Sequence, residues 1–148
     1  MKLTHDMLCH GVYIVGARHE DKASALAVAW ATQVATDKVL IAVGAQSYTR
    51  ELILKSGAFG LSMLEEGQQE LGRHFGTQSG RNVDKLATVE TETHKTGSPI
   101  LKNCALWLDC EVSDVFDLGS TKLIVGKVVA AGRNKATFTP LIYREREY

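Results

Sequence analysis

What the sequence lacks excludes several classes of protein. No apolar run approaches the roughly 20 residues that a membrane-spanning helix needs. The first residues, MKLTHDMLCHG, lack the apolar core of a secretion signal. The 17 basic and 17 acidic residues cancel to a formal net charge of zero, so no general nucleic-acid-binding surface is expected. We therefore predict a cytoplasmic protein whose partners include neither a membrane nor a nucleic acid.

Cysteines and familiar catalytic motifs are also scarce. Cys9, Cys104 and Cys110 are an odd number without a C-x-x-C pair, and we interpret them as reduced thiols. His5, Cys9 and His10 gather near the start, but no fourth ligand has a suitable spacing, so no metal site is expected. The chain contains no G-x-G-x-x-G, G-x-S-x-G or H-E-x-x-H motif. A Rossmann nucleotide site is therefore not expected, and no catalytic side chain is identified.

What remains is an ordinary globular composition, with 23% charged and 45% apolar residues. A chain of 148 residues is expected to form a single domain, residues 1–148, and to bury roughly 70% of its unfolded surface. Strand-like runs at regular spacing with few helices predict a mainly β protein with helical additions, organised as a β-barrel. The expected strands are residues 7–17, 23–33, 39–45, 58–64, 105–115, 121–131 and 137–143, and the expected helices are residues 48–56 and 65–75.

Three of these segments carry more specific predictions. The alanines of residues 23–33 would suit a helix, but its larger side chains alternate as in a strand, and we interpret it as a strand. Residues 39–45 are apolar almost throughout, which is typical of a strand covered on both faces. Gly126, inside a strand-like run, indicates a bulge or a close contact.

A polar corner, QSYT at residues 46–49, lies between an expected strand and an expected helix. The unpaired N–H groups of a helix's first turn and the positive end of its dipole favour an anion such as a phosphate. The hydroxyls of Ser47 and Thr49 would add donors. The alternative is that Ser47 is only the helix N-cap, a position that serine often occupies.

A second polar segment, residues 76–85, allows two interpretations. Ser79, Arg81 and Lys85 would supply further contacts to a phosphate. Alternatively, the segment is a solvated loop with a charged corner at Asp84 and Lys85.

In their order and spacing, these segments resemble the flavin reductase-like, FMN-binding split-barrel family over nearly the whole chain. GVYIVGARHEDKASALAVAW is similar to the family's first hairpin, and QSYTRELILKSGAFGLSML to its strand–helix–strand core. HFGTQSGRNVDKL is similar to a segment of the branch that contains flavoredoxins and flavoprotein domains fused to rubredoxin. SPILKNCALWLDCEV and LGSTKLIVGKVV occupy the positions of its long hairpin, and TPLIYREREY resembles its last strand.

The resemblance implies a six-stranded Greek-key barrel that forms a homodimer, with FMN as the cofactor near the subunit interface. The isoalloxazine ring would lie along residues 27–32, where alanines let backbone N–H groups approach the N1, O2 and O4 edge of the ring. Trp30 would either pack at the edge of the ring or anchor the core. The phosphate would lie at the polar corner, with Arg50 or Arg81 adding a positive charge. The predicted cofactor-binding residues are Ala27, Val28, Ala29, Trp30, Ala31, Thr32, Gln46, Ser47, Tyr48, Thr49, Arg50, Ser79 and Arg81.

The chain departs from the family at the tip of the long hairpin. Many members carry Gly-Asp-His-Thr there, and their histidine is associated with nicotinamide or substrate; this chain has Gly119-Ser120-Thr121-Lys122. The resemblance implies an oxidoreductase that takes electrons from NAD(P)H and passes them to a flavin, a metal or a redox protein. The alternatives are an FMN-bearing electron carrier without NAD(P)H activity of its own, and a dimeric binding protein that has lost flavin. FMN is preferred to FAD because no segment resembles an adenosine pocket.

Overall fold

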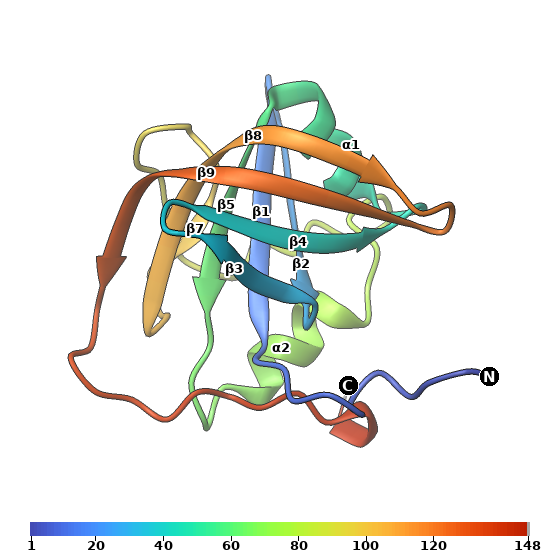
Figure 1. Cartoon of the computed structure of the whole chain (residues 1–148). Coiled ribbons are helices and arrows are strands. Elements are labelled where there is room, and N and C mark those ends of the chain that lie inside the picture. Colours follow the sequence, from blue (N-terminus) through green and yellow to red (C-terminus); the bar gives the residue numbers. More distant parts are fainter. Residues whose placement is uncertain (148) are drawn as a thin grey trace.

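The computed structural model describes residues 1–147, and most of its strands belong to one antiparallel sheet of seven (Figure 1). The order across the sheet is β2-β1-β5-β8-β9-β4-β3, and every neighbouring pair is antiparallel. β6 and β7 pair only with each other, in a separate two-stranded sheet, and β7 packs against β1 and β5. The strands are β1 (Tyr13–His19), β2 (Lys22–Val28), β3 (Ala31–Ala35), β4 (Lys38–Gly44), β5 (Ala58–Met63), β6 (Thr91–Glu92), β7 (Ile100–Leu101), β8 (Leu106–Asp117) and β9 (Thr121–Arg133). The expected mainly β split barrel with helical additions is thus confirmed.

The single strand predicted at residues 23–33 is wrong, because this segment forms two strands at opposite edges of the sheet. β2 pairs with β1 at one edge, whereas β3 pairs with β4 at the other. The chain leaves one edge and joins the other through Ala29 and Trp30, and the Trp30 carbonyl accepts the Ala42 N–H at 2.9 Å. This division gives seven strands where the resemblance implied six. It also brings the end of β2, at one edge of the sheet, next to the start of β3, at the other edge.

Two α-helices accompany the sheet, and a 3-10 turn, η1 (Glu145–Glu147), lies near the end of the chain. α1 (Tyr48–Ser56) has the predicted bounds, with the Ser47 side chain as its N-cap and Gly57, at φ 74°, after its last turn. α2 (Gln69–Gly76) begins later than predicted, because residues 65–68 form a turn closed by the Glu65 N–H to Gln68 Oε1 at 2.9 Å.

The strand predicted at residues 137–143 is wrong. The structure has only two isolated bridges there, Gly11 with Ile142 and Glu65 with Pro140. A proline has no backbone N–H to donate, so Pro140 interrupts any longer ladder.

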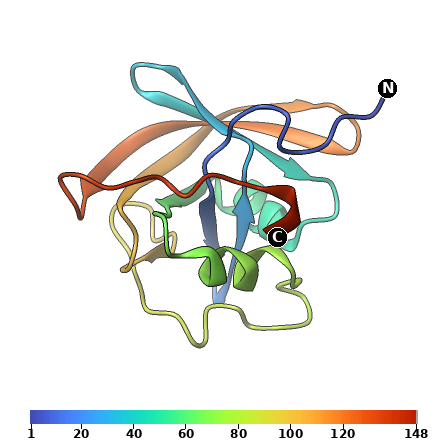
Figure 2. The ribbon, with the colours of Figure 1, turned by 90° about the horizontal axis from the view of Figure 1, so that it is seen from below.

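The helices pack on two separate parts of the core. Ile53 of α1 belongs to one cluster with Phe59 and Ile41. Phe75 of α2 belongs to the other with Ile14 and Leu64, and all six side chains are fully buried. Figure 2 shows α2 next to β1 and β2 at one end of the molecule. Cover is one-sided for β4, in which alternate residues are buried and the others are partly exposed. The expectation that both faces of residues 39–45 are covered is therefore not met.

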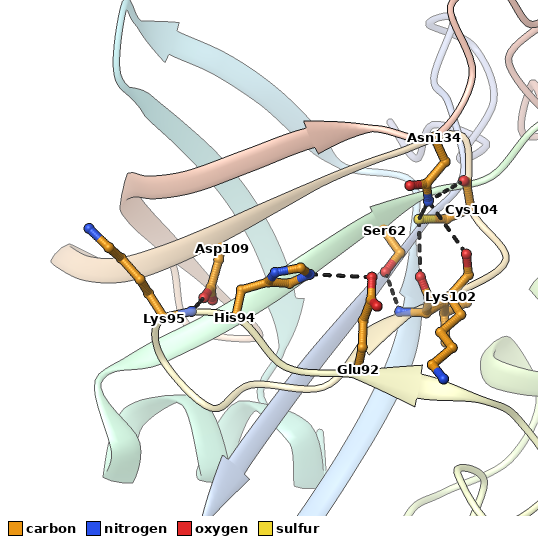
Figure 3. Close-up of polar contacts among 9 residues, drawn as sticks. Ser62, Glu92, His94, Lys95, Lys102, Cys104, Asp109 and Asn134 are labelled. Atoms are coloured by element: carbon orange, nitrogen blue, oxygen red, sulfur yellow. Dashed lines mark hydrogen bonds and ion pairs between the residues drawn. The ribbon is translucent and has the colours of Figure 1, made fainter.

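A buried polar cluster holds the long excursion between α2 and β8 against the sheet (Figure 3). The Asp109 carboxylate, fully buried in β8, accepts the N–H groups of Lys95 at 2.7 Å and Thr96 at 2.9 Å. The Ser62 hydroxyl of β5 accepts the Leu101 N–H at 2.9 Å. Because these buried acceptors have donors, the excursion docks without leaving charges or hydroxyls unpaired.

Candidate functional site

A pocket of about 260 Å³ opens where the two edges of the sheet meet. One wall is the end of β2 with the Ala29–Trp30 link, and the facing wall is the end of β4. Two glycines of α2 form its floor, so backbone is accessible on several sides. The lining residues are His5, Val12, Leu26, Ala27, Val28, Ala29, Trp30, Ala42, Val43, Gly44, Gly72, Gly76 and Tyr143. Such small, apolar walls suit a flat, rigid ligand.

The polar corner continues from one wall of this pocket. Gly44 lines the pocket, and its carbonyl accepts the Ser47 N–H at 3.2 Å. The Ser47 hydroxyl accepts the Arg50 N–H at 3.2 Å, which caps α1. The N–H groups of Tyr48 and Thr49 lie in the first turn, where a helix offers no carbonyl acceptor. With the helix dipole, they make the corner suitable for an anion.

Thr49, the last residue of the corner, and Arg50, which follows it, have different environments. The Thr49 hydroxyl donates to the buried Ser24 hydroxyl at 3.1 Å, so this side chain is directed into the fold. Arg50 has a buried Nε atom without a hydrogen-bond partner among the described residues. A buried unpaired donor is costly unless a ligand completes it. Arg50 is therefore the better placed cation for an anion in this corner.

Arg81 is already engaged by protein groups. Its guanidinium binds both carboxylate oxygens of Glu51, with Nη1 3.2 Å from Oε2, and lies 5.2 Å from the centre of the Tyr48 ring. The hydrogen bonds from Arg81 lower the pKa of the Glu51 carboxyl. This exposed pair fixes the loop over the start of α1, beside a second, polar cavity of about 520 Å³ that Tyr48 and Arg81 help to line.

Two further contacts hold the loop 77–87 in place. The Lys85 ammonium is buried and donates to the carbonyls of Phe75 at 3.2 Å and Gln78 at 2.9 Å, at the end of α2. Burial lowers the pKa of Lys85 to about 8. Gly80 lies so close to β2 that a Cβ there would come within 2.1 Å of Ser24 Oγ. Neither alternative considered for Lys85, a phosphate contact or a solvated corner, describes it, because its buried ammonium binds carbonyls at the end of α2.

The structure brings only part of the predicted site together in the first pocket. Residues 27–30 line it, whereas Ala31 and Thr32 lie on β3 and do not. Residues 46–50 form the adjoining corner, and the Ser79 hydroxyl accepts the Arg81 N–H at 3.2 Å in the loop above. Sequence reasoning missed the pocket residues His5, Val12, Leu26, Ala42, Val43, Gly44, Gly72, Gly76 and Tyr143. Of these, Gly72 carried a signal, because a glycine inside a helix is costly and usually has a packing reason, and Gly72 is buried in α2.

Comparison with known proteins identifies the family. The flavin reductase like domain profile matches residues 5–148, so the chain belongs to the flavin reductase-like family. It is 30% identical over 143 residues, 94% of this chain, to a putative diflavin flavoprotein A 3 of Nostoc sp.. Across four diflavin flavoproteins the chain spans only 19% to 25% of the relative's length.

Two solved structures are similar throughout. The flavoredoxin from Methanosarcina acetivorans aligns with a TM-score of 0.82 and 25% identity, covering 91% of this chain and 75% of that one. The FMN-binding protein from Thermus thermophilus, solved with bound p-hydroxybenzaldehyde, aligns with a TM-score of 0.84 and 27% identity, covering 90% and 77%. Across residues 1–147, no helix is long and apolar enough to span a membrane, and no group of side chains is arranged to hold a metal ion.

Proposed function

We propose that this chain binds FMN and serves as a flavin oxidoreductase that takes electrons from NAD(P)H. One observation carries the proposal: an apolar pocket of about 260 Å³, bordered by small residues, lies next to the polar corner at the start of α1, with Gly44 in its wall. A flat apolar ring joined by a polar chain to a phosphate requires this arrangement. The family match and the FMN-binding relative from Thermus thermophilus support the same ligand.

The ring system would lie between the two sheet edges. Ala27 and Ala29 on one wall and Gly44 on the other leave room for a planar group close to the backbone. Trp30, at the mouth, would contact its edge rather than anchor the core, since it is 40% exposed. Ala31 and Thr32, which lie on β3, would contact the flavin only if it extended beyond the pocket onto that strand.

The phosphate would lie at the start of α1. Ser47 and the N–H groups of Tyr48 and Thr49 would donate to its oxygens, next to Gln46. The unpartnered Nε of Arg50 fits a charged acceptor, whereas Arg81 would have to exchange Glu51 for the phosphate. Ser79 and Arg81 would close the site from the loop above.

A bound flavin supplies hydride and electron transfer, and the protein supplies position and electrostatics. His5 and Tyr143 are the only titratable side chains among the described residues that line the pocket. Apolar walls would exclude water from the ring, and backbone N–H groups of residues 27–30 would stabilise the negative charge that develops at its edge on reduction. The acceptor would be a flavin, a metal or a redox protein, reached through the open mouth.

The visible spectrum of the purified protein, before and after each nicotinamide, tests the proposal. We expect flavin absorbance that bleaches with NADH or NADPH. A colourless protein that takes up no added FMN on equilibrium dialysis would contradict flavin binding and favour a barrel that binds another ligand. Ser47→Ala with added FMN serves as the matched variant, because it removes one donor from the corner and leaves the pocket walls intact.

A second function, an electron carrier without NAD(P)H activity, is favoured by the hairpin tip. The Ser120 carbonyl accepts the Ala45 N–H at 2.8 Å, so the tip rests beside the corner and brings no imidazole to it. Stopped-flow absorbance separates the two functions. Fast bleaching by NAD(P)H supports the enzyme, whereas bleaching only by reduced rubredoxin or ferredoxin supports the carrier.

A further inference from the structure

The segment formed by residues 4–10 brings His5 to the pocket lining, and it is held by two hydrogen bonds that both follow His5 in the chain. The Asp6 carboxylate accepts the Glu145 N–H at 3.1 Å, and the His10 carbonyl accepts the Tyr143 N–H at 2.8 Å. Figures 1 and 2 both show this blue segment beside the dark red end of the chain. The hydrogen bond to Glu145 holds the pKa of the Asp6 carboxyl below its usual value, which keeps this acceptor ionised.

His5 is the residue of this segment that reaches the pocket. Its imidazole meets the Trp30 ring edge to face, with the ring centres 5.1 Å apart and the planes at 75°. The side chain is 54% exposed, so one side of the ring faces solvent and the other faces the pocket lining. The Glu145 carboxylate lies close to the imidazole, with Oε1 3.9 Å from Nδ1.

His5, Trp30 and Tyr143 therefore form an aromatic rim around the opening. An edge-to-face pair contributes modestly, and it breaks whenever the segment swings away. Because Asp6 and His10 are hydrogen-bonded, this movement is limited to the residues before Asp6, which include His5. A molecule wider than a single flat ring would have to displace this stretch before it reached the pocket contents.

We infer that His5 determines which redox partners reach the pocket: its contact with Trp30 keeps the mouth narrow, admits small planar aromatic donors and acceptors, and slows bulky ones. This inference rests on the proposed flavin function. It assigns a specificity role to a pocket-lining residue that lies on a segment with no regular secondary structure.

The first test needs no flavin. In a Trp107→Phe background Trp30 is the only tryptophan, and its fluorescence is titrated with acrylamide. His5→Ala is expected to raise the quenching of Trp30, and His5→Phe, which keeps a ring over Trp30, is expected to leave it unchanged. His19→Ala, at the far end of β1, is the control for loss of a histidine. Equal quenching in all variants would overturn the inference.

The second test uses the FMN-loaded protein, reduced with dithionite and mixed with benzoquinone or with di-tert-butyl-benzoquinone. His5→Ala is expected to speed reoxidation by the bulky quinone by about three- to tenfold, the range an aromatic pair allows, and to leave the small quinone's rate unchanged. FMN release, followed by fluorescence, should quicken by a similar factor. If the ratio of the two quinone rates were the same in wild type and His5→Ala, the role of His5 would be refuted. If neither wild type nor any variant bound FMN, the proposed function would be refuted as well.

Discussion

At the scale of single residues, two hydroxyls near the start of α1 have different tasks. Ser47 faces the corner and caps the helix, whereas Thr49 is buried and donates to Ser24 at 3.1 Å. The sequence places both in one polar motif and offers no means to separate them. The separation depends on which side of the helix faces β2, and that is a property of the packing.

Replacement of these hydroxyls should therefore affect different quantities. Ser47→Ala should lower the free energy of unfolding by about 1 kcal/mol through loss of the cap, and should also weaken FMN binding. Thr49→Val should cost about 1–3 kcal/mol, because the buried Ser24 hydroxyl loses its donor, and should leave FMN affinity nearly unchanged. Urea unfolding without flavin and a fluorescence titration with FMN measure the two effects. A larger affinity loss in Thr49→Val would show that our assignment is reversed.

Lys85 should give the protein a distinctive pH dependence. Burial lowers its pKa from 10.5 to about 8. Between these values the unfolded chain holds a proton that the folded chain has released, so this residue makes the free energy of unfolding rise with pH, by at most about 1.4 kcal/mol per pH unit. Below pH 8 the cost of the buried ammonium is fully present.

The comparison of wild type with Lys85→Met at pH 8 and pH 10 isolates this contribution. Methionine keeps the aliphatic stem and removes the titrating group, so the stability of wild type relative to the variant should increase at the higher pH. Lys55→Met, at an exposed lysine in the last turn of α1, controls for the loss of one positive charge. Parallel pH profiles of wild type and Lys85→Met would contradict the prediction.

At the scale of elements, prediction succeeded where the signal is local. α1 was located to the residue because Ser47, Glu51, Lys55 and Gly57 are all helix-end signals within one short segment. The division of residues 23–33 could not be predicted, because only the pairing of β3 with β4, across the sheet from β2, imposes the break. The pocket was half predicted for the same reason: its β2 wall was found, and its β4 wall depends on long-range pairing.

Gly126 of β9 is an example of a packing constraint that the sequence itself indicates. A Cβ at Gly126 would lie 2.6 Å from Phe59 Cζ and 2.8 Å from Cys110 Cβ, and the neighbouring ladder shifts register between Val112 and Asp114. Of the two alternatives expected at Gly126, the close contact is confirmed, and the bulge lies opposite it on β8.

Gly126→Ala should consequently lower the free energy of unfolding by about 1–3 kcal/mol through overpacking against the Phe59 ring. Gly44→Ala is the matched control, since Gly44 also lies in a strand and a Cβ there would meet no atom within 4 Å. Thermal unfolding of both variants without flavin measures the difference. Equal transition temperatures would mean that β9 shifts freely enough to admit the methyl group.

At the scale of the whole molecule, the exposed apolar side chains bear on assembly. Val115, Phe116 and Leu118 lie exposed near the tip of the β8–β9 hairpin, and Phe116 is 53% exposed. The same tip touches the polar corner through Ala45 and Ser120. A surface that joins apolar residues to the proposed phosphate site is suited to a subunit interface, which typically covers about 800 Å² on each partner.

We therefore predict a homodimer that sediments at twice the chain mass of 16.2 kDa. Phe116→Asp should shift it toward the monomer, because a carboxylate buried in an apolar interface has no partner, and should also speed FMN release from the adjoining corner. Leu54→Asp, at an exposed leucine of α1, places the same charge on another face and should leave the dimer intact. Sedimentation equilibrium at micromolar concentration distinguishes the outcomes. If both variants dissociated, the effect would reflect the added charge rather than the hairpin. If the wild type were a monomer, the prediction that the hairpin tip forms a subunit interface would be wrong.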